Sequence, residues 1–582
     1  MVSHASVAAG LAQLSPALSP TEFARELIVK ADSDVFATFA SSTLFTEDRL
    51  HKVGVKIINL LSTSTDKTLE EAITKIGNDL NLLVESCSAS ATAPKVPRVR
   101  FGKTNEMVSI LTCGGMRQQQ KWGPSITTMS QVEDDCQANF VEIILHSLKL
   151  GINHLETARG YGCSELQFGA ALNQLFTSGE VKREDILLQT KVGAKSTKAA
   201  FRKDLELSFE LLQVDYVDFF SVHGINRDKH LKWVVDNEDE NNWDVIQEYL
   251  DAGKIRHVGF SSHGTTDLIA AAINTDKFSY ANIHYHYFGS YTASGDGPTG
   301  GNRTTVDLLK AKNMGCFIIS PFDKGGMLYK PSTKLLSLHS PSLNPIEFTA
   351  CWLWQHELHS DSSVHTIVCG AARPSDLDEA AIASFGSMTK ECKGERANKK
   401  PNTNTNTNTK TLTNPPSRTD LVRATDQKLK NSFDSALGKE WGQMWHVGVP
   451  NCFQTQSGVN FTLAIWLYNI IEAFGMLEYA RERYKVTVGN REKWDKSATY
   501  EENMEKGDWG YCPGNAVELD EEYDSELKDV PTENRAKVLA GIRRAHKLCT
   551  MSPKEDGESE LVKEDWAAAH DLRPWTAFPE RG

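Results

Sequence analysis

Three short β-rich runs separated by longer helical stretches decide the fold of the centre of this chain: INHLETA (152–158), ILLQTKV (186–192) and VDFFSVH (217–223). An amphipathic stretch, FRKDLELSFELL (201–212), lies between the second run and the third. Strands that alternate with helices in this way are typical of βα units, in which the strands form a parallel sheet. The centre of the chain is therefore predicted to be an α/β domain.

The same alternation extends outward in both directions. Five further runs bring the candidate strands to eight: SILTCGG (109–115), IRHVGFSS (255–262), ANIHYHYF (281–288), CFIISPF (316–322) and HTIVCGA (365–371). Eight such units within residues 98–388 predict a (β/α)₈ TIM barrel, a fold of typically about 250 residues. The alternative is a doubly wound open sheet, which usually carries a glycine-rich fingerprint after its first strand. The pair Gly114-Gly115 does not form that fingerprint.

Composition divides the rest of the 582-residue chain into flanking segments. Residues 1–86 have helical periodicity and are followed by a linker at 87–97. A repeat of Asn and Thr, within PNTNTNTNTK, marks a low-complexity linker at 389–418. Residues 419–582 return to helical, tryptophan-containing sequence. We therefore expect a barrel with an N-terminal helical segment and a C-terminal helical extension.

Composition and charge exclude several classes of protein. The 63 Lys and Arg against 76 Asp and Glu give a net charge of −13, which argues against nucleic acid or an anionic membrane as the main partner. The apolar stretch FTLAIWLYNIIEAF (461–474) is too short to span a bilayer and reads as a buried helix. The 11 dispersed cysteines suggest neither a disulfide framework nor a metal site, and the N-terminus is a poor secretory signal. We expect a cytoplasmic protein without a metal centre.

Consecutive strand ends carry four titratable side chains. Glu156 and Tyr161 follow one another closely at the end of the second predicted strand, Lys191 ends the third and His223 ends the fourth. Catalytic groups of a parallel barrel lie at the C-terminal ends of its strands, so these four could converge. A nearby ammonium lowers the pKa of a tyrosine, a carboxylate orients the lysine, and a histidine polarises a carbonyl. Such a set could protonate an alkoxide as hydride reaches a carbonyl carbon, with a cofactor as the hydride source.

Longer motifs around these residues resemble the aldo-keto reductase family. RVRFGKTNEMVSILTCGGMR (98–117), GINHLETARGYGCSELQFGAAL (151–172) and GKIRHVGFSSHG (253–264) follow one another in the family's order. The resemblance implies a (β/α)₈ barrel that acts as an NAD(P)H-dependent carbonyl reductase on a small aldehyde or ketone. A barrel of this kind that is catalytically weak or inactive and serves a binding or regulatory role is the alternative.

Carried over residue by residue, the family's catalytic tetrad falls on Glu156, Tyr161, Lys191 and His223. The resemblance makes Tyr161 the general acid, Lys191 the partner that lowers its pKa, and His223 the residue that orients the substrate carbonyl. The family expects aspartate where Glu156 stands. One extra methylene moves the carboxylate by over an ångström, and such a displacement can cost on the order of 100-fold in rate. Glu156 could therefore be a structural partner of Lys191 in an altered site.

The resemblance also implies NADP as the cofactor, with NAD possible. The residues that would hold it are Gly115, Met116, Ser261, Ser262, Asn282, Ser320, Phe322, Lys324, Gly325, Gly370, Arg373 and Glu379. Many family members place arginine at the position of Asp376 to hold the 2′-phosphate of NADP, and asparagine at the position of Ala380. Aspartate repels a phosphate, whereas Arg373 could compensate, so the choice between NADP and NAD stays open.

Part of the C-terminal segment resembles the ferredoxin-like helical extension of some family members. PNCFQTQSGVNFTLAIWLYN (450–469) and YCPGNAV (511–517) keep its landmarks but retain only Cys452 and Cys512. A cubane iron–sulfur cluster normally needs four thiolates. We therefore expect a degenerate extension that packs as helices without a cluster.

Overall fold

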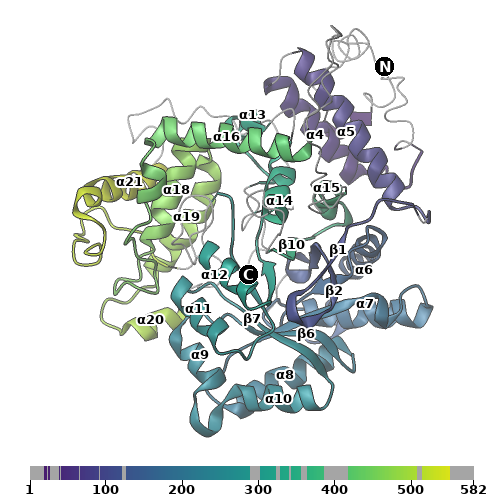
Figure 1. Ribbon diagram of the computed structural model, residues 1–582, viewed down its shortest axis with the longest axis horizontal. Coiled ribbons are helices and arrows are strands. Elements are labelled where there is room, and N and C mark those ends of the chain that lie inside the picture. The colour runs from purple at the N-terminus through teal and green to yellow at the C-terminus, as the bar shows by residue number, and fades with distance from the viewer. Residues whose placement is uncertain are drawn as a thin grey trace, which may run out of the picture.

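The computed structural model describes residues 19–22, 24–25, 39, 41–63, 66–90, 92–120, 126–288, 302–322, 328–339, 343–355, 364–385, 417–506 and 514–550. In these residues the chain forms a closed eight-stranded barrel with helical regions before and after it (Figure 1). The predicted TIM barrel with N-terminal and C-terminal helical segments is therefore confirmed. Residues 389–416 of the predicted linker lie outside the described part of the chain, and the predicted domain limits stay predictions.

All eight barrel strands are parallel, and each pairs with the next one along the chain. They are β3 (Leu111–Gly114), β4 (His154–Glu156), β5 (Leu187–Gly193), β6 (Val217–His223), β7 (Ile255–Ser261), β8 (Tyr280–Ile283), β9 (Gly315–Ile318) and β10 (Thr366–Gly370). The ring closes where β10 pairs with β3, with Ile367 opposite Leu111. Closure rules out the open sheet, and each strand overlaps one of the eight predicted runs.

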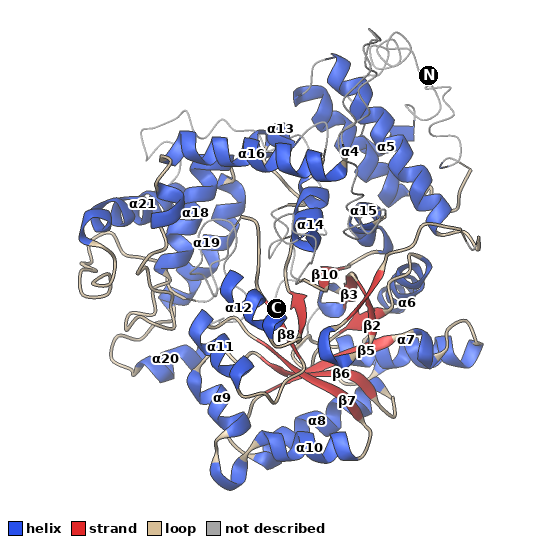
Figure 2. Ribbon diagram, viewed as in Figure 1, coloured by secondary structure: helices blue, strands red, loops and turns tan. Residues whose placement is uncertain are grey.

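Helices surround the barrel strands on the outside (Figure 2). They are α6 (Asp134–Lys149), α7 (Ser164–Ser178), α8 (Lys198–Leu212), α9 (Asp228–Val235), α10 (Asn242–Asp251), α11 (Thr266–Asn274), α12 (Arg303–Ala311), α13 (Thr333–His339), α14 (Pro345–Gln355) and α15 (Asp378–Ser384). Local signals set their limits. Before α8, the hydroxyl of Thr197 accepts a hydrogen bond from the amide of Ala200, and Gln213 in the left-handed conformation ends the helix.

A short antiparallel hairpin, β1 (Arg98–Arg100) and β2 (Met107–Ser109), precedes the barrel. Phe101, in the connection between its strands, packs against Phe219 and Tyr280 with ring centroids 5.4 Å apart in both pairs. These two residues lie near the N-terminal ends of their strands, so the hairpin covers that end of the barrel. The catalytic groups are therefore to be sought at the C-terminal ends.

The N-terminal helical segment is a pair of helices, α4 (Glu47–Thr63) and α5 (Asp66–Ser86). Helix α4 contacts α13, and α5 contacts α15, so the pair packs on helices that follow β9 and β10 (Figure 1). The predicted helical periodicity of the N-terminal segment is confirmed in these residues. The pair lies beside the turn in which the cofactor-binding residue Arg373 was predicted.

The C-terminal extension is helical, and it packs against the barrel's last helices, α13 and α14, through α16 (Figure 1). Its helices are α16 (Arg418–Leu437), α17 (Trp441–Met444), α18 (Phe461–Phe474), α19 (Leu477–Glu492), α20 (Tyr500–Lys506) and α21 (Thr532–Thr550). The apolar stretch predicted to be a buried helix has the limits of α18. Its Trp466 donates a hydrogen bond of 2.6 Å to the carbonyl of Phe288, which follows β8. Among the described helices, none has both the length and the apolarity needed to cross a membrane.

Candidate active site

Glu156, Tyr161 and Lys191 converge at the C-terminal ends of β4 and β5. The ammonium of Lys191 contacts a carboxylate oxygen of Glu156 and lies 3.2 Å from the hydroxyl of Tyr161. That hydroxyl lies 3.4 Å from the same carboxylate oxygen. Lys191 and Glu156 are 1% and 3% exposed, whereas Tyr161 is partly exposed. The three side chains therefore form one network, with the phenol at its outer end.

His223, the last residue of β6, completes the group. Its ring meets the ring of Tyr161 edge to face, with centroids 5.5 Å apart and planes at 86°. His223 is partly exposed, like Tyr161. The four residues predicted from consecutive strand ends are thus brought together.

The turn between β4 and α7 places Tyr161 over the lysine. The amide of Arg159 donates a hydrogen bond of 2.9 Å to the carbonyl of Lys191, so the turn follows the neighbouring strand. Lys191 in turn donates a hydrogen bond of 2.9 Å to the carbonyl of Thr157. Gln118 donates one of 2.9 Å to the carbonyl of Tyr161. The position of the phenol is therefore fixed by backbone contacts on both sides of the turn.

Burial dominates the electrostatics of the network. Burial raises the pKa of Tyr161 above its ordinary value and lowers the pKa of Lys191 well below the usual range of a lysine, while the contact with the Glu156 carboxylate favours the charged ammonium. Both directions follow from the cost of holding a charge away from water. Burial therefore outweighs the lowering of the Tyr161 pKa that was expected from Lys191, and the net shift is upward. The phenol remains protonated at neutral pH, which suits a proton donor.

A second buried carboxylate, which we did not predict, supports the turn. Glu165 in α7 is 1% exposed and forms an ion pair with Arg159. It also accepts a hydrogen bond of 2.5 Å from the hydroxyl of Thr190, the residue before Lys191. Glu165 thus links the turn that carries Tyr161 to the strand that carries Lys191. Arg159, Glu165 and Thr190 stand at irregular spacings in the sequence, so no periodic pattern indicates that they are in contact.

The residues predicted to hold a nicotinamide lie at the ends of β7 and β8. The hydroxyl of Ser261 accepts a hydrogen bond from the amide of Gly224, next to His223, and its own proton is available to a ligand. Ser262 instead donates to the carbonyl of Ile225 at 2.6 Å, which commits its hydroxyl to the loop. Asn282 is fully buried, and its amide nitrogen has no hydrogen-bond partner within the described structure. A buried amide donor that lacks an acceptor fits the carboxamide oxygen that a nicotinamide would supply.

Most of the residues predicted near the cofactor phosphates lie in the part of the chain that the structure describes, and two do not. Gly115 and Met116 lie in the turn after β3, and Gly370 ends the neighbouring strand β10. Ser320, with φ of +53°, and the buried Phe322 follow β9. Lys324 and Gly325 lie outside the described residues.

Gly115 is a position where the fold excludes a side chain. A Cβ there would lie 2.4 Å from the ring of Phe168 and 2.8 Å from the hydroxyl of Ser164. Ser164 also donates a hydrogen bond of 2.8 Å to the carbonyl of Gly115. The turn after β3 therefore packs closely on the start of α7, beside the turn that carries Tyr161.

Arg373 and Glu379 follow β10, and both contact helix α4 of the N-terminal segment. Arg373 forms an ion pair with Asp48, and Glu379 forms one of 3.3 Å with Lys56. The carboxylate of Asp376 is enclosed and accepts a hydrogen bond of 2.9 Å from the amide of Ala372. The contact between α4 and this turn was not predicted, because its residues lie more than 300 positions apart in the chain.

The two C-terminal cysteines were expected to remain from a lost cluster. Cys452 is buried, its sulfur accepts a 3.9 Å contact from the amide of Asn460, and its carbonyl accepts a hydrogen bond from Tyr500. Cys512 lies outside the described residues. Within the described part of the chain, no group of three or more His, Cys, Asp or Glu side chains is arranged to hold a metal ion. The ferredoxin-like character of the extension stays a prediction.

Comparison with protein families gives a match within the barrel. The model of the aldo/keto reductase family matches residues 111–367, from the first strand of the barrel into the last. Among curated proteins, the chain is 32% identical over 143 residues to aldo-keto reductase family 4 member C11 of Arabidopsis thaliana. It is 29% identical over 137 residues to the NADP-dependent D-sorbitol-6-phosphate dehydrogenase of Malus domestica. These matches cover 22% and 21% of this chain and 44% of each relative, so the chain spans less than half the length of the curated relatives it matches.

Solved structures of the same description also resemble the chain. The aldo-keto reductase AKR11C1 of Bacillus halodurans, in its holo form, is 21% identical, with a TM-score of 0.37 over 51% of this chain and 94% of that one. A Bombyx mori aldo-keto reductase in complex with NADP is 15% identical, with a TM-score of 0.38 over 51% of this chain and 91% of that one.

Proposed function

Because this chain belongs to the aldo/keto reductase family through its barrel, we propose that it is an oxidoreductase that reduces a small aldehyde or ketone with hydride from NADH or NADPH. The observation that carries the proposal is the 3.2 Å contact between the ammonium of Lys191 and the hydroxyl of Tyr161. It lies at the C-terminal ends of the barrel strands, where the catalytic groups of TIM barrels are found.

In this proposal Tyr161 is the general acid. Its phenol donates a proton to the carbonyl oxygen of the substrate as negative charge develops there. Burial raises the pKa of Tyr161 and so keeps the phenol protonated until that charge appears. Lys191 donates a hydrogen bond toward the phenolic oxygen and stabilises the phenolate that remains. Glu156 accepts from Lys191 and fixes its direction.

In this proposal His223 positions the ring of Tyr161 and does not supply the main proton. Its edge-to-face contact holds the ring of Tyr161, and the His223 ring is itself partly exposed. When bound, a reduced nicotinamide supplies the hydride that no side chain can supply. Ser261 and Asn282 are the residues that would hold its carboxamide, since the Ser261 hydroxyl can donate and the buried Asn282 amide lacks an acceptor in the described structure.

The remaining cofactor-binding positions complete the proposed site. Turns after β3, β9 and β10 would hold the phosphates and the adenosine, through Ser320, Arg373 and Glu379 among the described residues. The substrate's identity depends on the loops around the mouth.

The test is the oxidation of NADH and of NADPH by the purified protein with a panel of reactive aldehydes and quinones. We expect turnover with at least one pair, and a loss on the order of 10²–10⁴-fold in Tyr161→Phe, in line with the removal of a proton donor. Tyr216→Phe is the matched control, because Tyr216 precedes β6 at the opposite end of the barrel, where its ring lies 3.9 Å from the guanidinium of Arg183. Equal rates in wild type and Tyr161→Phe would contradict the proposal and favour a binding or regulatory protein.

A further inference from the structure

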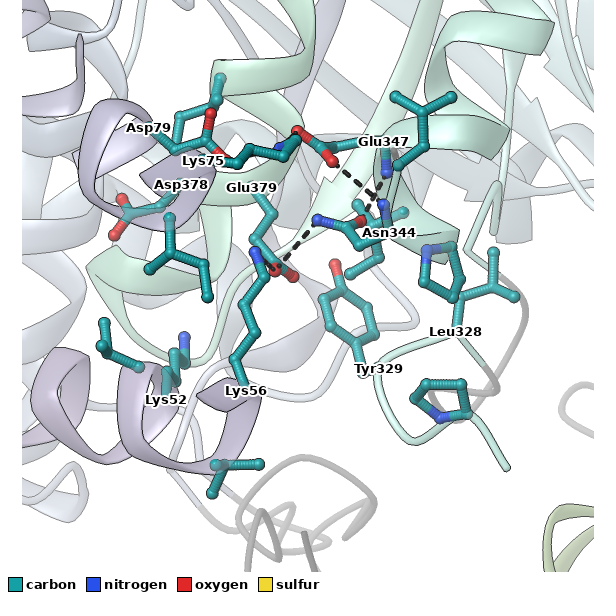
Figure 3. Close-up of a pocket in the computed structure, with 18 of the residues that line it drawn as sticks. Lys52, Lys56, Lys75, Asp79, Leu328, Tyr329, Asn344, Glu347, Asp378 and Glu379 are labelled. Atoms are coloured by element: carbon teal, nitrogen blue, oxygen red, sulfur yellow. Dashed lines mark hydrogen bonds and ion pairs between the residues drawn. The ribbon is translucent and has the colours of Figure 1, made fainter. Parts of the chain in front are cut away.

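The helix pair α4–α5 has no role in the proposed reaction, yet α4 lies against the turn after β10. A cavity of about 200 Å³ separates the pair from that turn and from the start of α14 (Figure 3). Polar groups of Lys56, Tyr329, Asn344 and Glu379 border it, and Lys56 and Glu379 form an ion pair across it. The N-terminal segment thus forms one wall of the space beside the residues proposed to hold the adenosine.

Asp48 on α4 lies beside this cavity rather than in its lining, and it contacts the turn after β10 as an anion would. One of its carboxylate oxygens forms an ion pair with Arg373, and the other accepts a hydrogen bond from the hydroxyl of Ser375. Lys52, one turn along α4, donates to the Ser375 hydroxyl at 2.6 Å and to Asp376 at 3.0 Å. The guanidinium and the hydroxyl that would otherwise be available to a bound phosphate are therefore engaged by a carboxylate of the chain itself.

The charges of this cluster are balanced without a ligand. Arg373 and Lys52 supply two positive charges, and Asp48 and Asp376 supply two negative ones. The Asp376 side chain is fully enclosed, and the other three are between 20% and 24% exposed, so solvent screens the cluster only in part. A phosphate monoester carries nearly two negative charges at neutral pH. A bound phosphate would add these negative charges beside the carboxylates of Asp48 and Asp376. Both cations of the cluster, Arg373 and Lys52, are already paired with a carboxylate.

We propose, on the basis of the proposed dinucleotide cofactor, that Asp48 makes this site select NADH, with its free 2′-hydroxyl, over NADPH with its 2′-phosphate. A ribose hydroxyl can donate a hydrogen bond to a carboxylate, whereas a phosphate at the same place meets like charge. Arg373 does not reverse this preference, because its guanidinium is already paired with Asp48. The N-terminal helix thus sets the specificity of a site whose other residues come from the barrel.

Other ion pairs hold α4 in place independently of Asp48. Arg49 donates to Asp378 at 2.7 Å, and Lys56 to Glu379 at 3.3 Å. Removal of the Asp48 carboxylate therefore takes away a charge without releasing the helix. A change in cofactor preference can then be read as an effect of that carboxylate.

The experiment is a fluorescence titration of the full-length protein with NADH and NADPH, in wild type, Asp48→Ala and Glu47→Gln. Glu47 is the matched control, because it is the neighbouring acid on α4, its side chain is 73% exposed and its partner is Arg25. We expect wild type to bind NADH at least tenfold more tightly than NADPH. Asp48→Ala should reduce this ratio at least tenfold, mainly through tighter NADPH binding, while Glu47→Gln keeps it. Asp48→Asn, which keeps an acceptor for Ser375, serves if the alanine variant does not fold.

A second titration, with 2′-AMP and 5′-AMP, probes the adenosine end alone. Asp48→Ala should gain affinity for 2′-AMP and change little for 5′-AMP. Suppose that both dinucleotides bind, and that the variants keep the wild-type affinity ratios of NADH to NADPH and of 2′-AMP to 5′-AMP. The inference about Asp48 is then overturned and the proposed reductase stands. If neither dinucleotide binds to any variant, the proposed function is contradicted and the inference is overturned with it.

Discussion

Shortening Glu156 to aspartate tests whether the glutamate is tuned to this site. In the structure one Glu156 oxygen contacts the Lys191 ammonium and lies 3.4 Å from the Tyr161 hydroxyl. Loss of one methylene withdraws the carboxylate by about 1.5 Å. The separation from the phenol, already longer than the usual O–H···O hydrogen bond, then increases, and the charged hydrogen bond with Lys191 is weakened.

The expected magnitude follows from the interaction that is lost. A hydrogen bond to a charged group contributes about 1.5–3 kcal/mol, and each 1.36 kcal/mol corresponds to about tenfold in rate. Glu156→Asp should therefore lower kcat/KM by about 10- to 100-fold. Steady-state oxidation of the preferred dinucleotide with the best carbonyl of the panel measures it.

Glu156→Gln separates length from charge in this experiment. It keeps the side-chain length but leaves Lys191, which is 1% exposed, without its carboxylate partner. We expect it to lose more activity than Glu156→Asp and also to lose stability in thermal unfolding. An increase of kcat/KM in Glu156→Asp would refute the reasoning, because it would show that the site works better with the shorter residue the family expects.

Three further predictions concern the contacts that shape the site. Asp378→Asn leaves Arg49, 7% exposed, without its carboxylate, so α4 should dock more weakly by about 3–5 kcal/mol, seen as faster hydrogen exchange in α4 but not in α10. Burial opposes ionisation of Asp378, but Arg49 and His146 outweigh it and hold its pKa at about 2, below the ordinary 3.8. Because the pKa is lower in the folded state, the ionised Asp378 should stabilise the fold fully above pH 4, and this stabilisation should be lost as the pH falls toward 2. Denaturant unfolding at several pH values would show the loss. Gly115→Ala places a Cβ 2.4 Å from the Phe168 ring and should destabilise the fold by about 1–3 kcal/mol, and an unchanged Tm would contradict the close packing of this turn.

The barrel could be predicted because its signal is local and repeated. Each of the eight strands is buried within a short apolar run, and helical periodicity follows each one. The hairpin β1–β2 was not predicted because its strands, RVR and MVS, lie in no apolar run like the one around the equally short β4. The run at 281–288 overestimated β8, which ends at Ile283, because the aromatic residues that follow are buried without being in a strand.

The candidate site was predictable where it depends on strand ends and unpredictable where it depends on distant contacts. Tyr161 and Lys191 come from neighbouring strand units, so their meeting follows from barrel topology. The pairing of Arg373 with Asp48 joins segments that no periodicity connects. The pKa of Tyr161 shows a second limit, since the charged neighbour can be predicted from the strand ends but the burial that raises the pKa cannot.

The most direct test of the central claim follows one atom. Each protein is given a reduced dinucleotide that carries deuterium at both C4 positions of the nicotinamide, together with a reactive aldehyde, and the product alcohol is examined by mass spectrometry. We predict deuterium on the carbinol carbon with wild type and with Tyr216→Phe, and none above background with Tyr161→Phe. Unlabelled alcohol from wild type, or equal labelling in all three proteins, would contradict a hydride transfer assisted by the phenol of Tyr161.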